Sequence, residues 1–163
     1  MELNISNKKT YILYGGGGHA KVVKDAIEKL KGEVVAIYDK DKPYQPHLYP
    51  NAELIIAIGN NSIREKISLE IHHNLATVIH PSASIANDVK IGAGTVVFAN
   101  AVVQAGVIIG KNCIINANTT IDHEAMIEDF VSIYPNTYIG GNARITKAKL
   151  IEPNTVVPRN TNY

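Results

Sequence analysis

Every sixth residue from Ile79 onward is isoleucine or valine. The series has fourteen members in one unbroken register: Ile79, Ile85, Ile91, Val97, Val103, Ile109, Ile115, Ile121, Ile127, Ile133, Ile139, Ile145, Ile151 and Val157. A period of six matches neither the 3.6 residues per turn of an α-helix nor the alternation of a β-strand. It is typical of a hexapeptide repeat, in which short straight segments alternate with corners. The sequence therefore predicts a parallel β-helix over residues 79–163.

A second position in each repeat supports this interpretation. The residue four places after each aliphatic one is small or β-branched everywhere except at Lys149. Such side chains fit an interior that has little remaining volume. With three hexads per coil, residues eighteen apart are predicted to stack, which places Gly141 directly on His123.

The first half of the chain has a different pattern. Three short apolar runs are predicted to be buried strands: residues 10–14, 34–38 and 54–58. Apolar residues at three- and four-residue spacing predict a helix over about 20–30. The order of these elements favours a small parallel sheet flanked by helices.

A second helix is expected after the third strand. Ser62 and Glu65 have the spacing of a capping box, which predicts a helix from Ile63 to about His73. We therefore expect two domains. Residues 1–78 would form a small Rossmann-like α/β domain that binds a nucleotide sugar, and residues 79–163 a β-helix.

Composition narrows the classes of function. The 163 residues contain 16 Lys and Arg against 15 Asp and Glu, which gives no reason to expect a nucleic-acid partner. The apolar runs are far shorter than the roughly 20 residues of a membrane-spanning helix. The first residues lack the features of a signal peptide. Cys113 is the only cysteine, so no disulfide framework is possible within the chain. We expect a cytoplasmic protein without a membrane span.

Four consecutive glycines, residues 15–18, lie between the first predicted strand and the first helix. The backbone N–H groups of such a loop, together with a helix N-terminus, can bind a phosphate. The loop formally matches the G-x-G-x-x-A dinucleotide pattern, but four glycines satisfy many patterns. Because the sheet looks too small for a complete dinucleotide fold, one nucleotide fits better. The alternative is the ordinary use of glycine in a tight turn.

Other candidates stand at the ends of the predicted strands. Asp39 ends the second strand, and Gly59 and Asn60 follow the third. The carboxyl ends of parallel strands meet at one edge of a sheet, so these residues would line one crevice. The predicted substrate-binding residues of this crevice are Gly15, Gly17, Gly18, His19, Asp39, Gly59 and Asn60.

The repeat contains one pair of residues suited to acid–base chemistry. His123 and Glu124 follow the inward Ile121 and are expected on the outer surface. A neutral imidazole can remove a proton from an attacking amine or hydroxyl, and an adjacent carboxylate can orient it. The alternative is that any outward position tolerates a polar residue. Gly141 could let a ligand approach the backbone, or could simply form a corner.

These motifs together resemble one family. The glycine loop, residues 58–61, the hexads and residues 121–124 are similar to those of sugar acetyltransferases related to the sialic acid O-acetyltransferases and the UDP-4-amino-sugar N-acetyltransferases of bacterial glycan synthesis. The resemblance covers residues 10 to about 145. It implies a left-handed coil, a homotrimer, and acetyl transfer from acetyl-CoA to an amino or hydroxyl group of a sugar or UDP-sugar, with no metal.

The resemblance also implies roles for individual residues. His123 would be the catalytic base and Glu124 would orient it. Gly141 would contact acetyl-CoA, and Asn116 would contact the acceptor; a side-chain ladder along the coil is the alternative for Asn116. The uridine diphosphate of the acceptor would bind at the Gly15–His19 loop.

The sequence departs from this family in its last coils. Relatives usually continue for further coils, and many carry a second histidine where this chain has Ser132. The short end predicts that part of the CoA site is missing. A weakened or non-catalytic trimeric scaffold that binds nucleotide sugars is therefore the alternative function.

Two further interpretations are weaker. An NAD-type domain fused to a structural β-helix lacks the second mononucleotide half. A zinc site of the γ-type carbonic anhydrase kind needs three histidines, whereas the repeat holds only His80 and His123.

Overall fold

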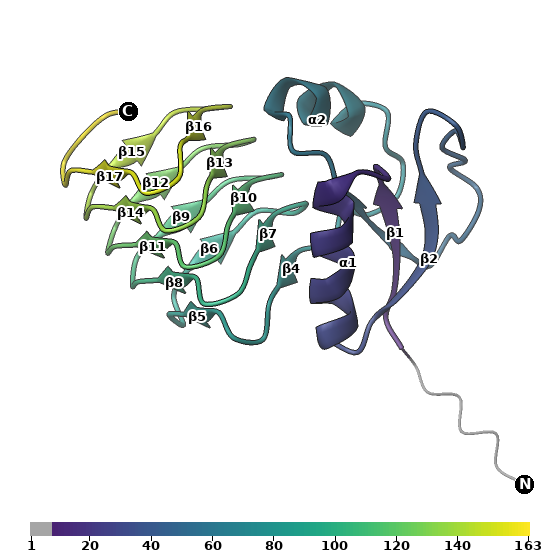
Figure 1. The fold of residues 1–163 in the computed structure, drawn as a ribbon, viewed down its shortest axis with the longest axis horizontal. Coiled ribbons are helices and arrows are strands. Elements are labelled where there is room, and N and C mark those ends of the chain that lie inside the picture. The colour runs from purple at the N-terminus through teal and green to yellow at the C-terminus, as the bar shows by residue number, and fades with distance from the viewer. Residues whose placement is uncertain (1–7) are drawn as a thin grey trace, which may run out of the picture.

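The structure is a computed structural model that describes residues 8–163. A small α/β unit lies beside a prism of short strands, and the chain passes from the first to the second without a long linker (Figure 1). The predicted fold class, a small parallel α/β domain followed by a parallel β-helix, is confirmed.

In its described part, from residue 8 onward, the N-terminal unit contains three strands and two helices. Their bounds are β1 (Thr10–Tyr14), α1 (Gly18–Lys29), β2 (Glu33–Tyr38), β3 (Glu53–Ile56) and α2 (Asn61–Ser68). The strands form a parallel sheet in the order β2-β1-β3. With these three strands the sheet is smaller than a complete dinucleotide-binding fold, which is the size that the sequence predicted.

Helix α2 differs from its prediction at both ends. The expected capping box was wrong: Asn60 is the N-cap, and its Oδ1 accepts the N–H of Ile63 at 3.0 Å. The helix also stops at Ser68 rather than near His73. The N–H groups of His72 and His73 instead donate to the Tyr44 hydroxyl, at 3.2 and 3.3 Å. A tertiary contact thus replaces the bonds that would have continued the helix.

The β-helix consists of fourteen two-residue strands. They are β4 (Val78–Ile79), β5 (Ser84–Ile85), β6 (Lys90–Ile91), β7 (Val96–Val97), β8 (Val102–Val103), β9 (Ile108–Ile109), β10 (Ile114–Ile115), β11 (Thr120–Ile121), β12 (Met126–Ile127), β13 (Ser132–Ile133), β14 (Tyr138–Ile139), β15 (Arg144–Ile145), β16 (Leu150–Ile151) and β17 (Val156–Val157). They form three parallel sheets, in the orders β16-β13-β10-β7-β4, β17-β14-β11-β8-β5 and β15-β12-β9-β6. Each strand pairs with the one eighteen residues on, as Ile121 does with Ile139.

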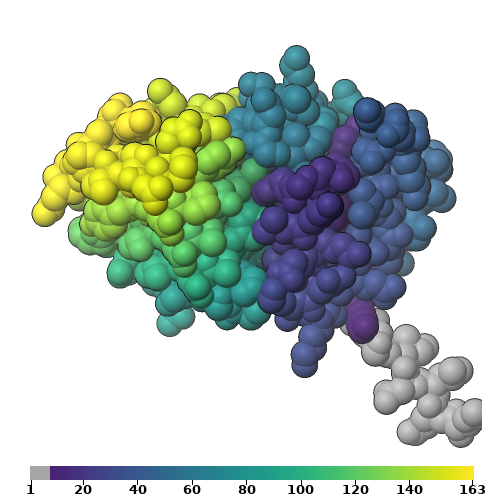
Figure 2. All heavy atoms as spheres, in the orientation of Figure 1, coloured from purple at the N-terminus to yellow at the C-terminus, as the bar shows by residue number. Residues whose placement is uncertain are grey.

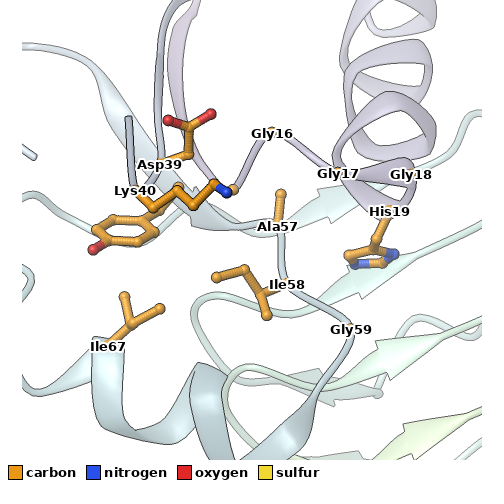
Figure 3. A pocket seen from close by; sticks show the side chains of 12 residues that line it. Gly16, Gly17, Gly18, His19, Asp39, Lys40, Ala57, Ile58, Gly59 and Ile67 are labelled. Carbon is orange, nitrogen blue, oxygen red and sulfur yellow. The ribbon is translucent and has the colours of Figure 1, made fainter. Parts of the chain in front are cut away.

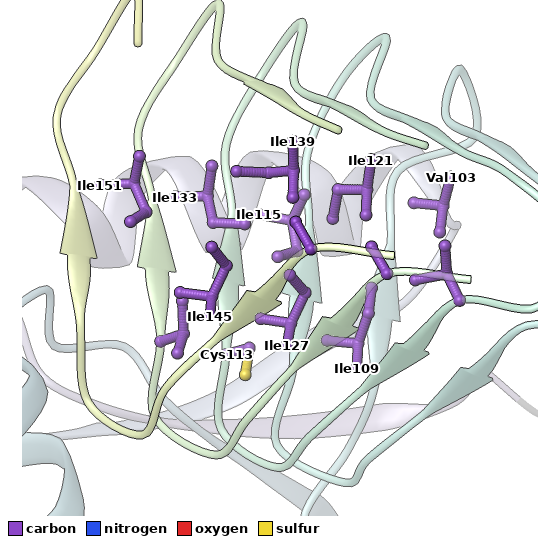
Figure 4. Packing of buried hydrophobic residues seen from close by; sticks show 14 of the residues in the cluster. Val103, Ile109, Cys113, Ile115, Ile121, Ile127, Ile133, Ile139, Ile145 and Ile151 are labelled. Carbon is purple, nitrogen blue, oxygen red and sulfur yellow. The ribbon is translucent and has the colours of Figure 1, made fainter. Parts of the chain in front are cut away.

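The second residue of each strand points into the prism, where the aliphatic side chains stack in columns (Figure 4). Ile127 in the middle coils is completely buried. Burial of one such side chain contributes about 1.5–3 kcal/mol. The hydroxyls of inward-facing threonines donate hydrogen bonds to backbone carbonyls near the corners. Thr95 Oγ1, for example, donates to the Gly110 carbonyl at 2.8 Å. The period-six series therefore marks the core.

The corners use a left-handed backbone conformation. From residue 94 to residue 160, every sixth residue has a φ between 52° and 81°. Asparagine and glycine, which tolerate this conformation best, occupy nine of these twelve positions. The exceptions are Glu124, Phe130 and Ala148. The left hand of the whole coil stays an expectation from the resemblance.

The two units share an apolar interface. Val23 and Ala26 of α1 belong to one buried cluster with Val78 and Val96 of the β-helix. Figure 2 shows α2 against the later coils, where the Asn61 side-chain amide donates to backbone carbonyls of residues 148 and 149. The boundary expected between residues 78 and 79 falls inside β4. In residues 8–163, no helix is both long and apolar enough to cross a bilayer.

Candidate functional site

A cavity of about 510 Å³ opens at the carboxyl ends of the three N-terminal strands (Figure 3). It brings together six of the predicted substrate-binding residues: Gly15, Gly17, Gly18, His19, Asp39 and Gly59. Tyr14, Lys40, Ala57, Ile58 and Ile67 complete most of the lining. The position at the strand ends is the usual place of a ligand in a parallel α/β sheet.

In the glycine loop, the groups suited to an anion are the amides at the start of α1, and not all four glycine N–H groups. The Gly15 N–H donates to the Tyr38 carbonyl at 2.7 Å, so the fold already uses it. Gly15 has a φ of 123°, and a Cβ there would lie 2.7 Å from the Ala57 carbonyl oxygen. Gly17 is the N-cap of α1 and supplies no side chain to bond the first-turn amides. Those amides and the positive end of the helix are therefore the groups suited to an anion.

Asp39 has one carboxylate oxygen committed to its own turn. Its Oδ1 accepts the N–H groups of Asp41 and Lys42, at 2.9 and 3.0 Å. Its Oδ2 lies beside Gly16, 2.6 Å from where a Cβ would stand. The first oxygen fixes the side chain, and the second is directed toward the glycine loop.

The imidazole of His19 lies between this cavity and a second one. Burial, aided by the nearby charge of Arg64, lowers the pKa of His19 to about 4, so the ring is neutral near pH 7. The ring packs edge-on against Phe98, with 5.7 Å between centroids. Its Nε2 is buried and has no hydrogen-bond partner. A buried polar atom of this kind is suited to a ligand or water partner.

The second cavity, of about 220 Å³, extends onto the β-helix. Its lining residues are His19, Gly59, Ile114, Asn116, Tyr134 and Pro135. Because His19 and Gly59 line both cavities, the two spaces meet at these residues. The Asn116 side-chain amide donates to the Ile133 carbonyl at 3.0 Å, so it is also part of the bonding along the coil. Asn60 lines neither cavity, because its side chain caps α2.

His123 and Glu124 form a pair on the corner after β11. The distance from His123 Nδ1 to Glu124 Oε2 is 3.1 Å, and both side chains are exposed. The His123 N–H donates to Asp122 Oδ1 at 2.8 Å, while the Tyr138 hydroxyl donates to Asp122 Oδ2 at 2.7 Å. The bond from Tyr138, and then that from the His123 backbone, lower the pKa of Asp122. Asp122 thus holds the backbone of His123 as an ionised acceptor.

Gly141 lies against the imidazole of His123, one coil further along. A Cβ on Gly141 would stand 2.8 Å from His123 Nε2. Gly141 itself is buried, and all three atoms nearest to that Cβ position belong to the His123 ring.

The structure does not unite the two groups of candidate residues within one chain. His123 lines neither of the two cavities that meet at His19. Within residues 8–163, there is no group of three or more His, Cys, Asp or Glu residues that could hold a metal ion.

Sequence reasoning missed a polar cluster at the junction of the two units. Arg64 of α2 is 1 % exposed and bonds both units. Ser132 is completely buried, and its hydroxyl donates to Asn61 Oδ1 at 2.6 Å. Ser132 thus belongs to the junction. No local motif marks these residues.

Comparison with known proteins identifies both halves of the chain. The PglD N-terminal domain family matches residues 11–71, and the bacterial transferase hexapeptide family, described by six repeats, matches residues 88–123. A UDP-N-acetylbacillosamine N-acetyltransferase from Bacillus subtilis (strain 168) is 31 % identical over 107 residues. The match covers 53 % of this chain and spans only half of the length of that relative.

One solved structure matches this chain over most of the length of both proteins. The acetyltransferase domain of PglB from Neisseria gonorrhoeae FA1090 is 30 % identical, with a TM-score of 0.68 over 93 % of this chain and 86 % of that chain. The same domain in complex with acetyl coenzyme A is 29 % identical, with a TM-score of 0.66 over 94 % and 86 % of the two chains. The chain belongs to this family of hexapeptide-repeat sugar acetyltransferases with a PglD-type N-terminal domain.

Proposed function

We propose that the protein transfers the acetyl group of acetyl-CoA to the amino group of a UDP-activated amino sugar in bacterial glycan synthesis. The relative from B. subtilis is named for N-acetylation of a UDP-linked sugar, and the PglB domain was solved with acetyl coenzyme A. The observation that carries the proposal is the His123–Glu124 pair lying against Gly141. The sequence left amine and hydroxyl acceptors open, and the named activity of the relative favours the amine.

The proposed chemistry is direct transfer between two substrates. The sugar amine attacks the carbonyl carbon of the acetyl thioester while His123 Nε2 removes a proton from the amine. The carbon–sulfur bond breaks, and the CoA thiolate leaves and takes up the proton. Glu124 holds the imidazole through Nδ1 and stabilises its charged form. The Gly141 N–H would stabilise the negative charge that develops on the carbonyl oxygen.

The two cavities would hold the acceptor. The diphosphate would bind at the N-terminus of α1, where N–H groups and the helix dipole favour an anion. Asp39 would contact the ribose or the uracil. From there the sugar would extend past His19 and Gly59 toward Asn116 in the second cavity.

The acceptor would reach the His123 of another copy of the chain. His123 does not line the cavities of its own chain, and the family resemblance implies a homotrimer. A symmetric assembly could place the cavities of one protomer beside the His123–Glu124 pair of the next. A cytoplasmic location, where acetyl-CoA is available, stays part of this proposal.

Substitution of His123 tests the activity. His123→Ala should lower acetyl transfer to a UDP-4-amino sugar by about 10²–10⁴-fold, measured as release of the CoA thiol. UDP binding and assembly should be retained. His80→Ala is the matched control, because His80 is the other repeat histidine and its ring forms hydrogen bonds only with Ser82 of its own turn. Unchanged turnover in His123→Ala would eliminate His123 as the base.

The alternative of a non-catalytic scaffold predicts a different ligand response. Thermal unfolding would be followed with acetyl-CoA, UDP, a UDP-amino sugar, free sialic acid and NAD, because a ligand that binds the native state raises the midpoint. The enzyme should respond to acetyl-CoA and UDP. A scaffold that binds nucleotide sugars should respond to UDP alone.

A further inference from the structure

The guanidinium of Arg64 lies between the nucleotide cavity and the β-helix. All its hydrogen bonds are between 2.8 and 3.2 Å long. The acceptors are the backbone carbonyls of Ile58, Gly59, Asn112 and Phe130, together with Asn61 Oδ1 and Ser132 Oγ. These acceptors suffice for the five N–H groups of an arginine side chain.

The partners of this buried guanidinium include no carboxylate. Burying it therefore costs free energy, because its charge leaves water without an opposite charge beside it. Burial lowers the pKa of Arg64 to about 10, so the side chain stays charged at neutral pH. An apolar residue of similar size would avoid the cost of desolvating that charge. Stabilising the contact between the two units therefore does not by itself explain an arginine at this position. The positions of its hydrogen-bond partners indicate another role.

The partners on the first unit belong to the cavity wall. Arg64 Nη1 donates to the carbonyl of Ile58 at 2.9 Å and to that of Gly59 at 3.1 Å. Both residues line the large cavity, and Gly59 also lines the small one. Arg64 is absent from the lining of either cavity, so it would act on the wall from behind through the backbone.

The partners on the second unit are fixed points of the coil. Nε donates to the Asn112 carbonyl at 2.8 Å, and Nη2 donates to the Phe130 carbonyl at 3.1 Å. Residues 112 and 130 are stacked corner residues, eighteen apart in the chain and both at positive φ. The guanidinium therefore spans from two corners of a rigid coil to the wall where the two cavities meet.

We propose that Arg64 is a positioning residue of the acceptor site: it ties the Ile58–Gly59 wall to the corners at Asn112 and Phe130, and so sets where the sugar lies relative to the β-helix. The inference rests on the proposed function. Arg64 does not contact the substrate in this account. Its loss would let the wall move, and an error of about 1 Å in substrate placement can cost up to about a hundredfold in rate.

The test compares substitutions at neighbouring positions of α2. Arg64→Met removes every bond, and Arg64→Lys keeps a charge but cannot reproduce the planar set of donors. Glu65→Gln is the matched control, because Glu65 forms an ion pair with Lys147 across the same junction and lines neither cavity. Ser132→Ala removes one acceptor of Arg64, together with the bond that Ser132 donates to Asn61, and serves as a milder variant if Arg64→Met does not fold.

The readout is the KM for each substrate together with the Kd for UDP. In Arg64→Met we expect the KM for the UDP-amino sugar to rise about tenfold or more while the KM for acetyl-CoA stays within about twofold. Arg64→Lys and Ser132→Ala should show smaller rises in the same direction, and Glu65→Gln none. A merely structural role would lower the melting temperature and the active fraction but leave both KM values unchanged.

The outcomes separate the two proposals. A KM for the UDP-amino sugar that is unchanged in Arg64→Lys and Ser132→Ala, with a functional wild-type enzyme, overturns the positioning role alone. A rise of the same size in Glu65→Gln also overturns it. Failure of the wild-type protein to bind UDP or to transfer acetyl groups overturns the proposed function, and this inference with it.

Discussion

The Cα of Gly141 faces the imidazole of His123 so closely that a methyl group on it would stand 2.8 Å from Nε2. Gly141→Ala should therefore push the ring away from its place beside Glu124. The imidazole is exposed and can move, so we expect stability to change little. The kcat for acetyl transfer should fall by about tenfold or more, because the base is misplaced. Wild-type kcat in this variant would contradict a catalytic arrangement at this corner.

Glu124 occupies a corner position that asparagine or glycine fills in most other coils. A left-handed conformation costs an ordinary residue about 1 kcal/mol or more, and such strain is often retained for function. Glu124→Asn should thus raise the melting midpoint by about 2–4 °C. The same change should lower kcat by about tenfold or more, because the imidazole loses its carboxylate.

Ala148→Asn is the control for the expected gain in stability and loss of activity in Glu124→Asn. Ala148 has a φ of 60°, close to the 58° of Glu124, and bonds through its backbone carbonyl to Asn61. This substitution should raise the midpoint similarly and leave kcat unchanged. If both variants are stabilised and both remain fully active, the carboxylate of Glu124 has no part in the reaction.

The neutral state of His19 predicts a pH dependence of stability. The pKa of His19 is about 4 in the folded chain, against an ordinary value of 6.5. Between these values the unfolded chain binds a proton that the folded chain does not, so stability falls as the pH decreases from about 6.5 toward 4. His19→Gln should reduce this loss, measured as urea midpoints at about pH 7.5 and pH 5. An equal loss in wild type and variant would show that His19 does not titrate in this way.

Cys113 should be unreactive in the native protein. Its thiol lies inside the prism and bonds the Glu128 carbonyl, and burial raises its pKa to about 11. Because the thiolate is the reactive form, labelling by a disulfide reagent should follow the rate of unfolding. Labelling of the folded chain within seconds would mean that the coil opens locally. The same reagent in denaturant provides the full-reaction control.

The sequence predicted the β-helix well because its signal is local and repeated. The period-six aliphatic series and the spacing of eighteen residues correctly predicted both the core and the stacking of Gly141 on His123. The asparagines and glycines of the left-handed corners form a second period-six signal in the sequence. The end of α2 was mispredicted because the Tyr44 hydroxyl, far along the chain, takes the N–H groups of His72 and His73.

The candidate site was only partly predictable for a related reason. The strand-end rule placed Asp39 and Gly59 in one cavity with the glycine loop. Arg64 could not be found in this way, because four of its six acceptors are backbone carbonyls. A carbonyl is present at every residue, so no pattern of residue types identifies it as a partner. The function of each candidate residue stays a prediction that the experiments above address.

The strand β4 has a consequence for how the molecule moves. Val78 is packed with the N-terminal helix and Ile79, its neighbour, with the interior of the coil. Adjacent side chains of this short strand therefore pack into the cores of the two different units. No flexible segment separates the units at this point, so they have no hinge here. The two units should therefore unfold in a single thermal transition. A substrate bound to the N-terminal unit should keep a fixed position relative to the β-helix of the same chain.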